Sequence, residues 1–105
     1  MSRYRIAFEA RKDLDTIWDY IAARSSAETA TEFIWRFYES FKSIASSPAA
    51  GILTNLGPEG TRKFPAGNYL IYYRVLRGRK MLILRVLHGK RRQDSAWGIQ
   101  SRTLF

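Results

Sequence analysis

The spacing of apolar residues changes twice along this 105-residue chain, and that change constrains the fold most strongly. In residues 3–8, Tyr4, Ile6 and Phe8 alternate with Arg3, Arg5 and Ala7, which is the period of a strand with one apolar face. From about residue 10 to residue 46 the spacing is that of amphipathic helices. Alternation returns after residue 61. This order predicts an α+β fold in one domain spanning residues 1–105.

Two helices are expected, over residues 10–24 and from residue 25 to about 46. The first has one apolar stripe made by Leu14, Ile17, Trp18 and Ile21. The second begins with Ser25 and Glu28, which read as a capping box. Its apolar stripe comprises Ala30, Phe33, Ile34, Phe37, Phe41 and Ile44. The short gap between the helices predicts an antiparallel helical hairpin.

The second half of the chain predicts an antiparallel meander after a long loop at residues 48–61. Pro48 ends the second helix. Strands are expected over residues 62–65, 69–76 and 80–88, with a turn at Gly67-Asn68. Gly78-Arg79 fits a two-residue type II′ turn between the last two strands. The whole order is β-α-α-β-β-β, with the helical hairpin on one face of a small, mainly antiparallel sheet.

A two-residue turn at Gly78-Arg79 pairs Arg77 with Lys80, so the numbers of any two paired residues in these strands sum to 157. One face is then almost wholly apolar and should pack on the helices; it carries Tyr69, Ile71, Tyr73, Val75, Leu82, Leu84, Val86 and His88. The opposite face mixes apolar residues with arginine, and carries Leu70, Tyr72, Arg74, Leu76, Met81, Ile83, Arg85 and Leu87.

The mixed face suggests a groove for a protein partner, because an apolar surface ringed by charge is typical of binding sites. Arg and Tyr are also frequent anchors of interfaces. The alternative is that the N-terminal strand, the C-terminal tail or a second subunit covers this face. Residues 93–105 form that tail, in which Trp97, Ile99, Leu104 and Phe105 could belong to a strand-like segment, a docked arm or a disordered end.

The net charge of +9 is unevenly distributed along the chain. Residues 1–60 hold seven Lys/Arg and eight Asp/Glu, whereas residues 61–105 hold eleven Lys/Arg and one acid. This asymmetry favours a nucleic-acid surface or an acidic protein partner over solubility alone. Lys90, Arg91 and Arg92 follow the last strand and could, with Arg62 and Lys63, meet phosphate or carboxylate groups. The alternative is a solvated charge run.

Several classes of site are excluded or disfavoured by composition. The chain has no cysteine, so thiolate chemistry and cysteine-ligated metals are excluded. A single histidine, His88, gives no set of metal ligands, and no Gly-rich phosphate loop follows a strand. We expect no metal and no cofactor. No apolar stretch approaches a signal peptide or a membrane span, so the cytoplasm is the expected location.

Catalysis is permitted by the sequence but not indicated by it. Metal-free RNA cleavage needs a base, an acid and cations for the phosphorane. His88, Arg85, Arg62 and Tyr73 could supply these groups. However, the predicted register places Arg85 and His88 on opposite faces of the sheet, and a lone histidine beside Tyr69 is more often structural. No catalytic residue is therefore assigned.

The ordered pattern of residues 4–92 resembles the ParE/RelE toxin superfamily, and the ParE (plasmid stabilisation) branch in particular. The matching residues are Tyr4-Arg5-Ile6, Ala10, Asp13-Leu14, Ile17, Tyr20-Ile21, Ala30, Pro48-x-x-Gly51, Gly60-x-Arg62, Tyr69-x-Ile71-x-Tyr73-Arg74-Val75 and the closing stretch Ile83-Leu84-Arg85-Val86-Leu87-His88-Gly89-x-Arg91. A typical signature of this branch places an acid directly after the final arginine, whereas here Arg92 follows.

This resemblance implies the toxin of a type II toxin–antitoxin system, forming a hetero-oligomer with an antitoxin whose acidic C-terminal segment wraps it. It further implies DNA gyrase as the target, inhibited by binding, with a RelE-type ribosome-dependent mRNA endonuclease as the alternative. We expect the mixed face to hold the antitoxin, with Arg74 and Arg85 as anchors. Arg62, Lys63, Lys90, Arg91 and Arg92 are expected to contact the target, and direct contact with nucleic acid is a further option.

Overall fold

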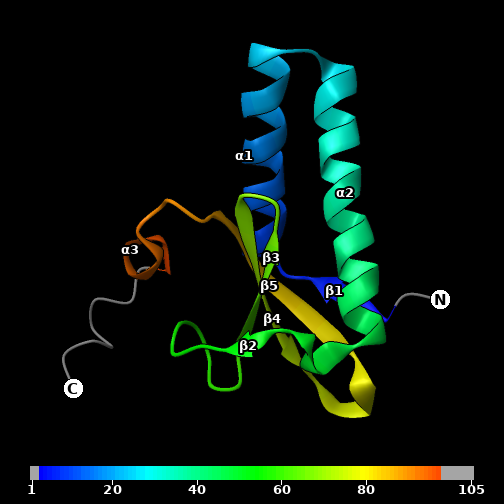
Figure 1. Ribbon diagram of the computed structural model, residues 1–105, viewed down its shortest axis with the longest axis vertical. Helices are drawn as coiled ribbons and strands as arrows, with labels where there is room; N and C mark the ends of the chain where they lie inside the picture. Colours follow the sequence, from blue (N-terminus) through cyan, green and yellow to red (C-terminus); the bar gives the residue numbers. More distant parts are fainter. Residues whose placement is uncertain (1–2, 98–105) are drawn as a thin grey trace.

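Two long helices stand side by side against one face of a five-stranded sheet (Figure 1). The computed structural model describes residues 3–97. Its elements are β1 (Tyr4–Ile6), α1 (Phe8–Arg24), α2 (Ala27–Ser46), the 3₁₀ turn η1 (Pro48–Ala50), β2 (Ile52–Leu53), β3 (Arg62–Ala66), β4 (Tyr69–Val75), the 3₁₀ turn η2 (Arg77–Arg79), β5 (Met81–His88) and α3 (Gln93–Trp97). This arrangement confirms the predicted α+β fold with its helical hairpin.

The helical hairpin forms as predicted, with one change at its centre. The cap of α2 is Ser26 and not Ser25, because the Ser26 side chain accepts a hydrogen bond from the Thr29 N–H at 3.1 Å. Glu28 therefore falls in the first turn, where the helix dipole favours an acid. The buried positions of both helices form one continuous stripe against the sheet: Ala10, Leu14, Ile17, Phe37, Phe41 and Ile44.

The sheet has the order β1-β5-β4-β3-β2. All neighbouring strands are antiparallel except β1, which runs parallel to β5, with Arg5 opposite Leu82 and Ile6 opposite Ile83. The loop predicted at residues 48–61 contains η1 and the short edge strand β2. The first strand ends at Ile6, so Phe8 lies in α1 and is 72% exposed instead of belonging to a strand.

The predicted register is correct for half of the β4–β5 pair and wrong for the other half. Tyr69 pairs with His88 and Tyr72 with Arg85, as expected, but Tyr73 pairs with Ile83. Leu84 is thus the extra residue of a β-bulge, and the residues of β5 that precede it, 81–83, face the side opposite to the predicted one. Met81 and Ile83 consequently lie in the core under the helices and not on the mixed face.

The connection between β4 and β5 also differs from the predicted type II′ turn. Residues 77–79 form the 3₁₀ turn η2, and both Gly78 (φ 69°) and Arg79 (φ 64°) adopt the left-handed conformation. A type II′ turn has a positive φ only at its first central residue. The longer connection accommodates the strand pairing that the bulge has shifted by one residue.

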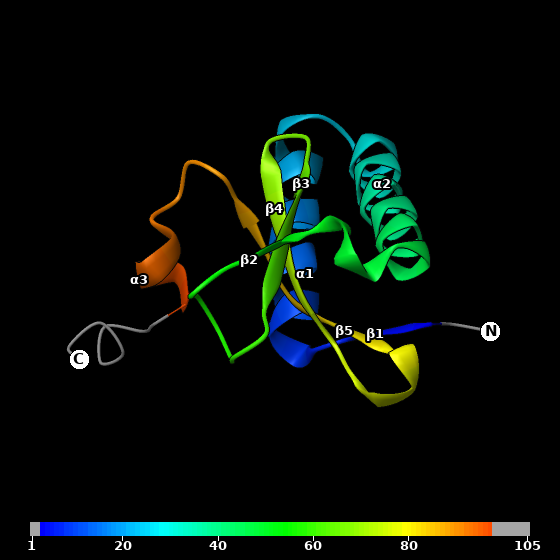
Figure 2. The same ribbon diagram turned by 60° about the horizontal axis from the view of Figure 1, so that its bottom comes forward.

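The second face of the sheet, which we call the outer face, is partly covered by α3. Figure 2 shows α2 and α3 on opposite sides of the strands. Trp97 packs edge-on against Tyr72 with ring centroids 5.2 Å apart, and the Tyr72 hydroxyl donates to Gln93 Oε1 at 2.7 Å. The start of the tail is therefore a docked helix. Ile99, Leu104 and Phe105 lie outside the described residues.

Candidate functional site

An ion pair between Asp13 and Arg85 joins three elements of the fold. The Asp13 carboxylate accepts from Arg85 Nε at 2.8 Å and Nη2 at 2.9 Å, and from the Val86 N–H at 2.9 Å. The pairing of β1 with β5 ends at Ile83, so no strand lies beside β5 at Val86 on this side. The Asp13 carboxylate accepts the Val86 N–H in place of a strand. Arg85 Nη1 donates to Ala96 O in α3 at 2.8 Å.

The Asp13–Arg85 pair is well shielded, with side chains only 10% and 14% exposed. The hydrogen bonds that Arg85 donates to the Asp13 carboxylate raise the pKa of Arg85, against the opposing effect of burial. Asp13 was not predicted from the sequence to be a site residue. The available signal was its place beside Leu14 and four residues before Ile17, at the border of the buried stripe of α1.

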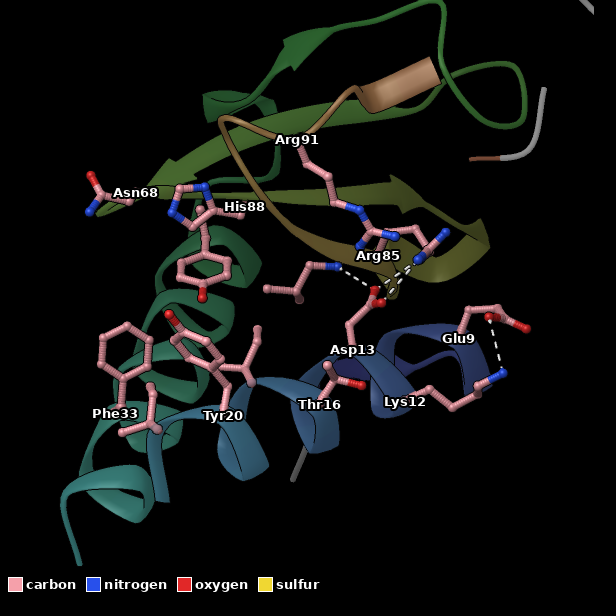
Figure 3. Close-up of a pocket in the computed structure, with 14 residues that line it drawn as sticks. Glu9, Lys12, Asp13, Thr16, Tyr20, Phe33, Asn68, Arg85, His88 and Arg91 are labelled. Carbon is pink, nitrogen blue, oxygen red and sulfur yellow. Dashed lines mark hydrogen bonds and ion pairs between the residues drawn. The ribbon is translucent and has the colours of Figure 1, made fainter. Parts of the chain in front are cut away.

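A groove of about 680 Å³ lies between α1 and the C-terminal end of β5 (Figure 3). We call it the α1–β5 groove. The register places Arg85 and His88 on opposite faces of the sheet, as expected. The Arg85 side chain nevertheless reaches around the edge of β5 to Asp13, so both residues line this groove. The other lining residues are Glu9, Lys12, Asp13, Thr16, Ile17, Tyr20, Ile21, Phe33, Asn68, Tyr69, Val86 and Arg91.

His88 lies beside Tyr69 in this groove, where the predicted register places it. Its ring packs edge-on against Tyr69, with centroids 4.9 Å apart. Its Nδ1 accepts from the Lys90 N–H at 3.1 Å. Among the described residues His88 Nε2 has no hydrogen-bond partner, and Arg91 has no ion-pair partner. Both groups therefore remain available to a ligand in the groove.

The four residues considered for RNA cleavage lie in two different places in the structure. Tyr73 is buried, and its hydroxyl donates to Pro48 O at 2.7 Å and accepts from the Gly51 N–H at 2.8 Å. Arg62 Nη1 donates to Gly51 O at 2.7 Å. A Cβ atom at Gly51 would lie 2.5 Å from Tyr73 Oη, so this approach requires glycine. Tyr73 and Arg62 thus hold the chain after α2, away from His88 and Arg85.

The residues expected to bind the antitoxin are also rearranged. Leu70, Tyr72, Arg74 and Leu87 keep their predicted place on the outer face, whereas Leu76 lies beyond the end of β4. Tyr72 and Leu87 are buried there, and α3 covers part of this face, so the hypothesis that the chain's own tail shields it is partly correct. Because of the bulge, Leu82 and Leu84 replace Met81 and Ile83 on this face, and both are half-exposed.

The basic residues expected to contact the target do not form one group. Arg62 is held by Gly51, whereas Arg91 lines the α1–β5 groove. Arg92 Nη2 pairs with Asp94 at 3.0 Å, and this contact lowers the pKa of Asp94. Lys63 pairs with Tyr72 across the sheet.

Two classes of site find no support in residues 3–97. No group of three or more His, Cys, Asp or Glu side chains is placed to hold a metal ion there. Within the same range, no helix combines the length and the apolar character that a membrane crossing requires.

A family model and a curated relative that match this chain both carry the name ParE toxin. The family model described as the ParE toxin of the type II toxin–antitoxin system parDE matches residues 4–93. The protein named Toxin ParE1 of Caulobacter vibrioides is 33% identical over 88 residues, covering 84% of this chain and 90% of that protein.

Two solved structures share the fold. One is a chromosomal ParDE system from P. aeruginosa, with a TM-score of 0.68 and 22% identity over 84% of this chain and 95% of that chain. The other is the RelBE2 toxin–antitoxin complex of Mycobacterium tuberculosis, with a TM-score of 0.53 and 26% identity over 81% of this chain and 94% of that chain.

Proposed function

Because the chain belongs to the ParE toxin family of type II toxin–antitoxin systems, we propose that a cognate antitoxin holds it silent and that, once released, it inhibits DNA gyrase by binding. The antitoxin would contribute an acidic C-terminal segment. Both structural neighbours come from toxin–antitoxin systems, which supports a partner of this kind. The chain acts as a binding poison and performs no chemistry in this proposal.

The outer face of the sheet is the observation that carries the antitoxin proposal. Leu70, Leu82 and Leu84 are half-exposed there, and Arg74 lies beside them without an ion-pair partner among residues 3–97. An apolar strip bordered by cations suits an amphipathic segment rich in acids. The segment would occupy the part of the outer face that α3 leaves open.

Arg74→Ala tests this placement. Loss of one arginine from an ion pair buried by the partner costs about 2–5 kcal/mol, so we expect affinity for the antitoxin to fall at least tenfold. Titration calorimetry with the antitoxin measures it, and Arg36→Ala on α2 is the matched control. A change below about twofold for Arg74→Ala would contradict the placement. Arg85→Ala is less informative, because Arg85 also holds α1, β5 and α3 together.

The target is tested by inducing the toxin without its antitoxin and dividing each culture between two assays. A gyrase supercoiling assay should show lost supercoiling or trapped DNA breaks, while mRNA stays intact. Substituting Lys90, Arg91 and Arg92 together should weaken this effect if they contact the target. Early cleavage of translated mRNA with normal supercoiling would overturn the gyrase proposal.

A ribosome-dependent mRNA endonuclease is the second candidate, and the α1–β5 groove favours it more than the sequence did. His88 and Arg91 line the groove together with the hydroxyl-bearing Tyr20 and Tyr69. These groups could serve proton transfer and charge stabilisation at a phosphate. In this case His88→Ala should abolish toxicity while the fold survives.

A further inference from the structure

The sheet brings basic residues from the start of the chain and from residues 74–80 together beside η2. Arg5 lies opposite Leu82 in the parallel pair of β1 and β5, and the Met81 N–H donates to Arg3 O at 3.0 Å. β5 starts directly after Arg77, Gly78, Arg79 and Lys80. Figure 2 shows β1 running along β5 next to the connection between β4 and β5. This proximity results from the topology and is not visible in the charge distribution along the sequence.

The same residues share the outer face. Tyr4 and Ile6 pack into the core, so Arg3 and Arg5 point away from the helices, because side chains alternate along a strand. Leu82 is flanked by Arg5 on one side and Arg74 on the other. With neighbouring strands about 4.8 Å apart, the backbones at Arg5 and Arg74 are roughly 10 Å apart.

None of these cations is neutralised within residues 3–97. The three ion pairs found there involve Lys12, Arg85 and Arg92. Glu59, in the loop that Arg74 approaches at Gly60, forms no ion pair with any of the described residues. We call the resulting cluster the hairpin-end patch; it comprises Arg3, Arg5, Arg74, Arg77, Arg79 and Lys80.

We propose that the hairpin-end patch binds the phosphate backbone of double-stranded nucleic acid, duplex DNA in particular. Guanidinium groups match phosphate oxygens in a bidentate geometry. The patch holds no aromatic side chain, whereas single strands are bound largely by stacking of bases on aromatic rings. Protein hot spots combine arginine with Trp and Tyr, and this patch lacks the aromatic part of that combination. Cations without aromatic anchors therefore favour backbone contacts that are independent of sequence.

This inference goes beyond the proposed function, because it gives the toxin a nucleic-acid contact of its own. It is tested with purified toxin alone, by fluorescence anisotropy with a short labelled DNA duplex of mixed sequence. Neither gyrase nor antitoxin is present, so failure of the gyrase proposal leaves the result unaffected, and the reverse also holds.

Two double variants each remove two positive charges of the patch from a different segment of the chain. R3Q/R5Q acts in and before β1, and R77Q/R79Q acts in η2. Log affinity falls with log salt, and each lost phosphate contact makes this fall less steep by about 0.9. We expect each variant to reduce the steepness by roughly 1.8 and to weaken binding by about tenfold or more near 0.1 M salt. The double variant R11Q/R36Q removes the same charge from exposed positions of α1 and α2 and should change affinity less than about twofold.

The outcomes divide clearly. The proposal is overturned if R11Q/R36Q weakens binding as much as the patch variants, since net charge would then be sufficient. It also fails if only one segment matters, or if single-stranded DNA binds more tightly than the duplex. Equal binding of duplex RNA and duplex DNA supports recognition of phosphate alone, and tighter binding of DNA supports DNA as the ligand. Matching unfolding midpoints of the variants exclude misfolding as the cause of a loss.

Discussion

The hydroxyl group of Tyr73 joins β4 to the turn that follows α2, because it pairs with both Pro48 O and the Gly51 N–H. The side chain was a catalytic candidate by type alone, as a tyrosine in the basic half of the chain. Its partners give it a structural task instead. They also explain the Pro48-x-x-Gly51 motif, in which proline starts the turn and glycine admits the tyrosine ring.

Tyr73→Phe should lower the free energy of unfolding by about 1–3 kcal/mol, because it leaves a buried N–H and a carbonyl without their partner. Urea unfolding followed by circular dichroism measures this loss. Tyr20→Phe is the matched control, since Tyr20 is 56% exposed, and it should stay within about 0.5 kcal/mol of the wild type. An equally small change for Tyr73→Phe would contradict the structural role of the hydroxyl.

Among the elements, helices were easier to predict from sequence than the pairing of β4 with β5. Apolar residues recur at helical spacing along α1 and α2, so only the helix starts shifted. α1 begins at Phe8 instead of about residue 10, and the cap of α2 is Ser26 instead of Ser25. In β5 the run Met81-Leu82-Ile83-Leu84 is uniformly apolar. Such a run gives no polarity to mark which side chains face the core, so the bulge at Leu84 could not be located from sequence.

The groove and the patch depend on contacts between distant segments, which is why sequence reasoning missed both. Asp13 meets Arg85 only when α1 lies along the free edge of β5. Arg3 and Arg5 come to lie beside the connection between β4 and β5 only when β1 pairs with β5 in parallel. A sequence pattern gives the period of each element but not its neighbours, so the residues that line such sites become apparent only in the folded structure.

The short helix α3 should contribute measurably to stability although it has only five residues. Trp97→Ala removes the ring that packs on Tyr72 and on the Arg85 guanidinium. We expect a loss of about 1–3 kcal/mol, below the range for a fully buried aromatic because Trp97 is only partly buried. Trp35→Ala on α2 makes the same change at a side chain that is 61% exposed. If the two variants unfold at the same urea concentration, α3 does not pack on the sheet in solution.

Across the whole molecule, charge is segregated by layer and not only by position along the chain. Asp15, Asp19, Glu28, Glu32 and Glu39 lie on α1 and α2, whereas most Lys and Arg residues lie in or around the sheet. The molecule therefore presents an acid-bearing helical side and a strongly basic sheet side. A field of this kind speeds the approach of a polyanion or an acidic segment and orients it toward the sheet.

We expect the free energy of unfolding to fall in alkaline solution, because several tyrosines are buried in the fold. Burial is the main cause that raises the pKa of Tyr4, Tyr69, Tyr72 and Tyr73 above the usual 10.0. Unfolded tyrosines ionise near that value, so the unfolded state loses protons first as pH rises, and unfolding becomes easier. The stabilisation is thus complete below about pH 10 and is lost as pH rises through the folded pKa values.

Urea unfolding between about pH 9 and pH 11 measures this decline. In Tyr72→Phe the decline should be shallower, since one protonated buried hydroxyl is gone. Tyr20→Phe removes an exposed hydroxyl instead and is the matched control. Both variants keep every lysine and arginine, so the difference between them isolates the buried tyrosine. An identical slope in the two variants would mean that the Tyr72 hydroxyl ionises as readily in the folded sheet as in the unfolded chain, which is incompatible with its burial beneath α3.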